Sequence, residues 1–142
     1  MNNSILKLTF ATLIGSFFYL IVGFLVFDLA FGSYTEAHTT QIIGFKKTED
    51  FSFLFLYLSC LAYSLLINFI LHHSAISSLF KAFSFSAIVG VLVACMTDFF
   101  WYASSYFYSN FKVILLDIFG ASITVGALGC LSYFIQTKKQ NT

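Results

Sequence analysis

Charge and proline are what this sequence has least of. It contains no proline, all seven of its basic residues are lysine, and charged residues make up only 9% of the chain. An average soluble domain has about 25% charged residues, so this chain has too few to cover a surface that faces water. Without proline, helices can run unbroken over long stretches. The net charge of +1 also gives no electrostatic basis for binding nucleic acid.

The sequence motifs of common enzymes and metal proteins are absent too. None of Cys60, Cys95 and Cys130 forms a CxxC pair, so the sequence predicts neither a thiol redox motif nor a structural zinc site. There is no Ser/His/Asp triad, phosphate-binding loop or HExxH motif. We therefore expect no cofactor and favour a protein that is not an enzyme. The identity of any bound metal stays open.

Long apolar segments are what the chain has in abundance, since 59% of its 142 residues are hydrophobic. A helix needs about 20 residues to cross the hydrocarbon core of a membrane. Continuous apolar runs without alternation argue against the strands of a β-barrel. The sequence predicts an all-α integral membrane protein, a single domain over residues 1–142 folded as an antiparallel four-helix bundle. The predicted spans are residues 8–27, 51–71, 82–106 and 113–136, with an outer loop at 32–50.

The lysines predict the orientation of this bundle. Four spans place both termini on one side, which would carry four lysines against three on the other. This excess favours a multi-pass protein of the inner (plasma) membrane with both termini in the cytoplasm. A cleaved signal peptide is the alternative interpretation of the first segment, but the length of the segment and its FDLAFG ending favour a span.

Asp98 lies inside the third predicted span and is the strongest candidate for a functional residue. A charged side chain at membrane depth costs roughly 2.5–3.5 kcal/mol on insertion scales, so it is kept mainly where it faces other helices, water or a ligand. Trp101 and Tyr102 follow it and are candidate ligand contacts. Together with Tyr106 and Tyr108 they also fit an aromatic belt at the membrane surface.

Asp28 and Asp117 are the expected partners of Asp98. Asp28 ends the first span and Asp117 begins the fourth, so all three acids belong to one leaflet. If their faces converge, they could not all stay ionised without a cation, a basic partner or a proton. The alternative is that Asp28 and Asp117 are solvated at span ends. Asp117 would then also suit the first turn of its helix, where the helix dipole favours a carboxylate.

Small and polar residues predict where the helices pack against one another. Gly120, Ala121 and Thr124 share a face of the fourth span, and their size would let another helix approach closely. Ser64 and Asn68 recur at helical spacing in the second span and mark its inward face.

The two halves of the chain resemble each other weakly. A shift of 70 residues aligns Asp28-Leu-Ala-Phe31 with Asp98-Phe-Phe-Trp101, and LSCLAY with LGCLSY. The bundle would then consist of two duplicated helical hairpins, a parallel repeat of the kind known in transporters. Chance similarity is the alternative in a chain this rich in Leu, Phe and Tyr.

Three short motifs resemble those of a family of uncharacterised small bacterial inner-membrane proteins with four helices. That family has Asp-x-x-Trp near the end of its first span, Tyr-Asp late in its third and Asp-Ile-x-Trp-Gly near the start of its fourth. The matching residues here are Asp28 with Phe31, Thr97-Asp98, and Asp117-Ile-Phe-Gly120. Phe replaces Trp, Thr replaces Tyr, and the third motif is one residue shorter. The resemblance implies the four-helix fold and the three aspartates, and it implies no activity.

These features predict a binding or transport component for a cation, a proton or a small cationic solute, held by the carboxylates of the outer leaflet. Its partners would be the lipid bilayer and either further copies of the chain or a larger membrane complex. A structural or assembly subunit of such a complex is the alternative function. A lipid-modifying membrane enzyme ranks third, because the sequence has neither an Asp-x-x-Asp motif nor an arginine to bind phosphate.

Overall fold

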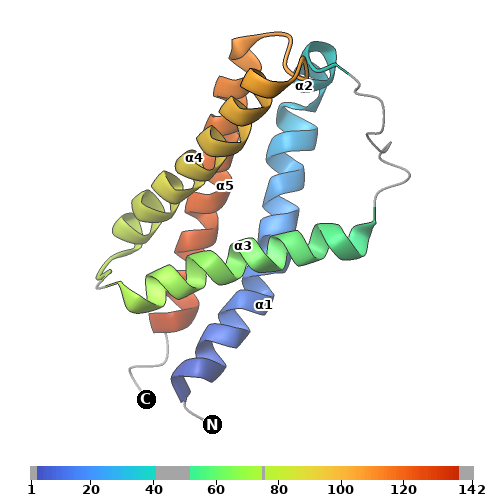
Figure 1. Ribbon diagram of the computed structural model, residues 1–142. Coiled ribbons are helices and arrows are strands. Elements are labelled where there is room, and N and C mark those ends of the chain that lie inside the picture. Colours follow the sequence, from blue (N-terminus) through green and yellow to red (C-terminus); the bar gives the residue numbers. More distant parts are fainter. Residues whose placement is uncertain (1–2, 41–51, 75, 138–142) are drawn as a thin grey trace.

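Four long helices dominate the computed structural model of the chain, which describes residues 3–40, 52–74 and 76–137 (Figure 1). The elements are α1 (Asn3–Gly23), η1 (Phe24–Ala30), α2 (Gly32–His38), α3 (Phe53–His73), α4 (Leu79–Ser104) and α5 (Phe111–Thr137). Four segments are long and apolar enough to cross a membrane, namely Ile5–Ala30, Phe53–His73, Leu79–Ser104 and Phe111–Thr137. The prediction of an all-α protein with four membrane helices packed in a bundle is confirmed.

The predicted outer loop is partly helical. Residues 32–38 form α2, while residues 41–50 lie outside the described part of the chain. Figure 1 shows α2 and the connection between α4 and α5 at one end of the molecule, and the start of α1 and the end of α5 at the other. We refer to these as the α2 end and the terminal end.

The first span changes its helical form before it ends. α1 continues directly into η1, a seven-residue π-helix, and the Phe31 N–H donates to the Val26 carbonyl oxygen five residues earlier at 3.1 Å. A π-helix is wider than an α-helix and turns its side chains to different positions, and such segments are often found at functional sites. The predicted α-helical register therefore does not apply to Asp28, which lies in η1.

α4 and α5 pack along one another through small side chains. The buried residues of α4 recur at every fourth position, at Ala82, Ser86, Gly90, Ala94 and Asp98. A Cβ atom added at Gly90 would lie only 2.8 Å from the Ala121 carbonyl oxygen of α5. The two backbones are therefore in direct contact, as small residues permit in membrane helices. Asp98 is the last residue of this buried stripe on α4.

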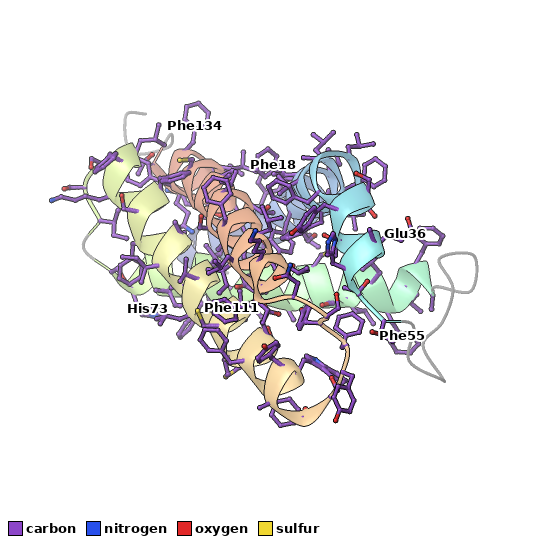
Figure 2. All side chains as sticks on the ribbon, turned by 90° about the horizontal axis from the view of Figure 1, so that it is seen from above. Phe18, Glu36, Phe55, His73, Phe111 and Phe134 are labelled. Carbon is purple, nitrogen blue, oxygen red and sulfur yellow. The ribbon has the colours of Figure 1, made fainter. Side chains whose placement is uncertain are left out.

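α3 crosses α1 and α5 at a steep angle, as the two views of Figure 1 and Figure 2 agree. The crossing centres on Gly15 of α1, where an added Cβ would lie 2.5 Å from the Ser64 hydroxyl oxygen of α3 and 3.0 Å from a Leu128 methyl of α5. The Ser64 hydroxyl also donates to the Thr12 carbonyl oxygen at 2.9 Å. One glycine and one hydrogen bond thus join the three helices where they cross. Because of this crossing, α3 departs from the near-antiparallel packing predicted for the bundle.

The helix-packing residues predicted from the sequence occupy several contacts. Ser64 and Asn68 are buried in α3, and Thr124 is buried in α5 with its hydroxyl bonded to the Gly120 carbonyl oxygen at 2.8 Å. Gly120 faces η1, since an added Cβ there would lie 2.7 Å from the Phe27 ring. Large apolar side chains cover the outside of all four helices, which suits a surface in contact with lipid (Figure 2).

Candidate functional site

Asp98 is the deepest acidic side chain whose surroundings the structure describes. It closes the buried stripe of α4 and is only 4% exposed. The residues before it on the stripe are small, so α5 lies close enough to exclude solvent and lipid from the carboxyl group. The sequence feature that buries this charge is therefore the spacing of Ser86, Gly90 and Ala94.

Asp117 of α5 lies next to Asp98, close enough for the two carboxyl groups to interact electrostatically. Two ionised carboxylates in this position repel each other, so a proton or a cation between them would be favourable. Asp117 is partly buried, in the second turn of α5. The structure thus brings together two of the three predicted acids as a pair.

Tyr108 completes this pair from outside the helices. Its hydroxyl donates to Asp98 Oδ1 at 2.9 Å. Burial, the hydrogen bond to Asp98 and the negative charge of both aspartates raise the pKa of Tyr108. Tyr108 consequently remains a hydrogen-bond donor at neutral pH. The sequence places this tyrosine in an aromatic belt and gives no signal of its contact with Asp98.

Backbone pairing between two distant segments fixes the position of Tyr108. Thr39, just after α2, forms an antiparallel bridge with Tyr108. The Thr40 N–H donates to the Phe107 carbonyl oxygen at 2.8 Å, and the Ser109 N–H donates to the His38 carbonyl oxygen at 3.0 Å. The end of α2 and the α4–α5 connection therefore form one small cap over the aspartate pair.

The second oxygen of Asp98 has no such donor. Asp98 Oδ2 is buried and accepts no hydrogen bond from an N–H or hydroxyl group of the described residues. The hydroxyl oxygens of Thr12, Ser86 and Ser132 are also buried without a partner. Those groups are neutral, whereas an unsatisfied carboxylate oxygen carries a much larger desolvation cost. Asp98 Oδ2 is therefore the atom at which a proton or a cation would gain most.

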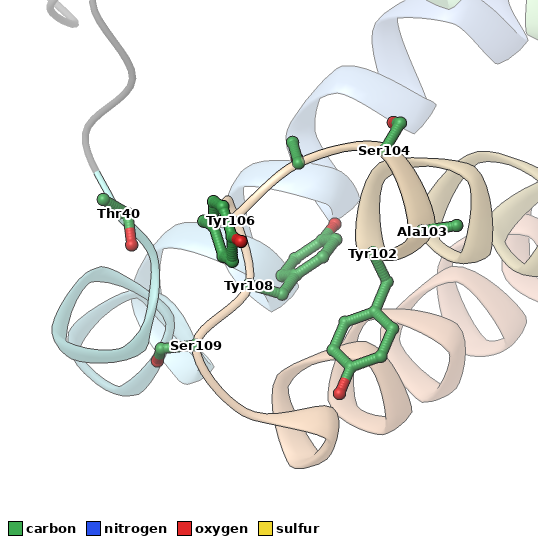
Figure 3. Close-up of a pocket in the computed structure, with 8 residues that line it drawn as sticks. Thr40, Tyr102, Ala103, Ser104, Tyr106, Tyr108 and Ser109 are labelled. Atoms are coloured by element: carbon green, nitrogen blue, oxygen red, sulfur yellow. The ribbon is translucent and has the colours of Figure 1, made fainter.

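A cavity of about 680 Å³ opens beside Tyr108 at the α2 end. Figure 3 shows Tyr102, Tyr106 and Tyr108 around it. Seven of its eight lining residues carry a hydroxyl group, namely Thr40, Tyr102, Ser104, Ser105, Tyr106, Tyr108 and Ser109. Since Tyr108 lines this cavity and also bonds to Asp98, it connects the cavity with the aspartate pair.

The remaining candidates lie at different positions. Tyr102 lines the cavity and is half exposed, and Trp101 is 39% exposed with its ring near that of Phe107. Asp28 is exposed and lines a separate groove between η1 and α3. Val26 and Phe27 of η1 lie against Gly120 of α5, whereas Asp28 is exposed. The structure thus does not bring Asp28 to the other two acids.

Metal binding by a larger set of ligands finds no support within residues 3–40, 52–74 and 76–137. No group of three or more His, Cys, Asp or Glu side chains there is arranged to hold a metal ion. The acidic centre of the described residues is therefore a pair of carboxyl groups with one tyrosine.

The chain matches no protein-family model, no curated protein and no solved structure. Its four long apolar helices are those of a small four-span membrane protein, and these comparisons identify no family. The resemblance built on three short motifs therefore remains a prediction, and the function has to be inferred from the site.

Proposed function

We propose that the chain is a binding or transport component of a membrane, and that the Asp98–Asp117 pair exchanges one proton for one small cation. The cavity at the α2 end would be the route to the pair. The observation that carries the proposal is the contact between two carboxyl groups, one of them 4% exposed with an oxygen that no donor group reaches.

The charge of the pair is the reason for expecting a single positive charge. Two ionised carboxylates in contact repel each other, and burial makes each ionised form more costly. One proton or one monovalent cation between them replaces this repulsion by attraction to both groups. Binding of a cation would then displace the proton, which couples the two ions by competition for one place.

The number of ligands favours a monovalent cation over calcium. Calcium takes 6–8 oxygen ligands in proteins. The pair and Tyr108 offer fewer oxygens than that, and no larger cluster of ligands exists among the described residues. The hydroxyl-lined cavity suits a partly hydrated inorganic cation or a small ammonium ion.

Proton release provides the first test. Sodium, lithium or methylammonium chloride is added to the purified protein in weakly buffered detergent, and the released protons are measured with a pH indicator. We expect about one proton per chain at saturation, because in this proposal one cation replaces one proton at the pair. Asp98→Asn should release none. Asp28→Asn is the matched control and should behave as the wild type, because Asp28 lies outside the pair.

The same variants separate transport from binding. In vesicles that contain the protein, a proton gradient should drive uptake of the cation that releases protons in detergent, and Asp98→Asn should abolish it. Binding without uptake would indicate a binding component only. Proton release by Asp98→Asn equal to that of the wild type would overturn the proposal.

A further inference from the structure

A second, apolar groove lies on the opposite side of the first span from the α4–α5 contact. Because α3 crosses α1 at one point and then diverges, a wedge of about 540 Å³ opens between the two on the side of the α2 end. Apart from Asp28 the lining side chains are apolar or weakly polar, among them Tyr19, Gly23, Phe24, Phe27, Phe53 and Cys60.

Gly23 accounts for part of the depth of this groove. A Cβ atom added there would meet no atom within 4 Å, so the glycine does not serve a close contact between helices. This distinguishes it from Gly15, Gly90 and Gly120, where an added Cβ would lie within 2.9 Å of a neighbouring helix. The space above Gly23 is open to whatever fills the groove in the membrane.

Asp28 gives the groove its one charged residue. It is exposed, and it lies two residues before the end of the candidate span Ile5–Ala30. An acidic side chain at this position meets the lipid headgroups, where it favours a cationic partner. The groove therefore combines an apolar channel of membrane depth with an anionic group at headgroup level.

We propose that this groove binds one phospholipid with a primary ammonium headgroup, of the phosphatidylethanolamine type. One acyl chain lies along Gly23 and Phe24 between η1 and the start of α3, and the ammonium group donates to the Asp28 carboxylate. A choline headgroup has no N–H group to donate to Asp28, and the net negative headgroup of phosphatidylglycerol would be repelled by it. The groove is separate from the Asp98–Asp117 pair, and the inference does not depend on the function proposed for that pair.

Spin-labelled lipids test this proposal directly. The wild-type protein is placed in phosphatidylcholine vesicles, and electron paramagnetic resonance measures how strongly labelled phosphatidylethanolamine, phosphatidylcholine and phosphatidylglycerol are immobilised. We expect phosphatidylethanolamine to associate about two- to five-fold more strongly than phosphatidylglycerol, the range that an exposed ion pair provides. Equal association of the three lipids would overturn the proposal.

Two variants with different expectations make the result specific. Gly23→Leu fills the groove without a clash and should remove the immobilised phosphatidylethanolamine, whereas Ala62→Leu, on an exposed part of α3 outside the groove, should leave it unchanged. Asp28→Asn should keep one immobilised chain but lose the preference among headgroups. If Gly23→Leu instead changes the oligomeric state and not the lipid signal, a second copy of the chain fills the groove and the proposal fails.

Discussion

The buried polar groups around Asn68 and those around Asp98 are built in opposite ways. Toward the terminal end, Asn68 donates to the Ser64 carbonyl oxygen at 2.9 Å and accepts from the Gln136 amide at 3.0 Å. Toward the α2 end, Asp98 accepts from Tyr108 at one oxygen and has no donor at the other. The first cluster is neutral and its central side chain is satisfied, whereas the second is acidic and incomplete.

The difference indicates two uses for polar groups in a membrane. Hydrogen bonds between neutral side chains join membrane helices, and the Asn68 cluster links α3 to α5 while Ser64 links α3 to α1. An acidic pair contributes no comparable link and costs desolvation energy, so its retention points to ion binding. Variants that exchange the central residues of the two clusters, or remove one of their contacts, test this difference.

Reciprocal exchange of the two central residues should have the largest effect. Asn68→Asp puts a carboxylate beside the Ser64 carbonyl oxygen, removes the amide donor and should lower the free energy of unfolding by about 2.5–3.5 kcal/mol, the cost of a charge at membrane depth. Asp98→Asn removes a charge and should not lower it. Both are measured by titrating mixed micelles with a denaturing detergent. Equal destabilisation by the two exchanges would contradict the distinction between the clusters.

Gly90→Val tests whether the small-residue stripe brings the aspartates together. Its Cβ would lie 2.8 Å from both the Ala121 carbonyl oxygen and the Val125 Cβ, and the backbone oxygen cannot move away cheaply. We expect a loss of about 1–3 kcal/mol in the free energy of unfolding, as for other overpacked contacts, and a weaker cation-driven proton release. Gly23→Val, which meets no atom, is the matched control. Unchanged proton release in Gly90→Val would show that the small-residue stripe is not needed to position the two aspartates.

Gln136→Ala tests how much the hydrogen bond between Gln136 and Asn68 contributes to the neutral cluster. It removes the donor to Asn68 Oδ1 and should cost about 0.6 kcal/mol, the average for hydrogen bonds between membrane helices, and at most about 1.7 kcal/mol. The neighbouring Thr137→Ala is the control, because the Thr137 hydroxyl bonds only within its own helix. Proton release should be the same in both variants. A change in proton release would couple the two clusters.

The sequence predicts the spans well because their existence depends only on the length and composition of the apolar runs. It also identifies Asp98 as a buried acid, since its span continues beyond it on both sides. It does not show that Asp98 pairs with Asp117 and not with Asp28, nor that Asp28 lies in a π-helix. The position of Tyr108 beside Asp98 depends on its backbone pairing with Thr39, a contact between segments far apart in the chain.

The internal repeat stays a prediction, and the structure gives its two halves different packing. α4 and α5 lie alongside each other, whereas α1 and α3 cross (Figure 1). The repeat makes Asp28 and Asp98 equivalent, yet one is exposed on a π-helix and the other buried on an α-helix. Sequence similarity of this short length does not determine which side of a helix meets a neighbour.

Tyr108→Phe should have the smallest effect on stability and the most informative pH dependence. Because the folded protein raises the pKa of Tyr108, this residue stabilises the fold fully below its ordinary value of 10.0. Above that pH the unfolded chain loses the proton first, so the free energy of unfolding should fall as pH rises. Tyr108→Phe should make that slope less steep, by less than the release of one full proton would produce, since Tyr108 is only partly buried.

The slopes of the free energy of unfolding between pH 9 and 11 are compared in the same micelles, and Tyr106→Phe, on a 93% exposed residue, serves as control. If Tyr108→Phe leaves the slope unchanged, the hydroxyl does not donate to Asp98 in the membrane protein, and the cap does not cover the acidic pair.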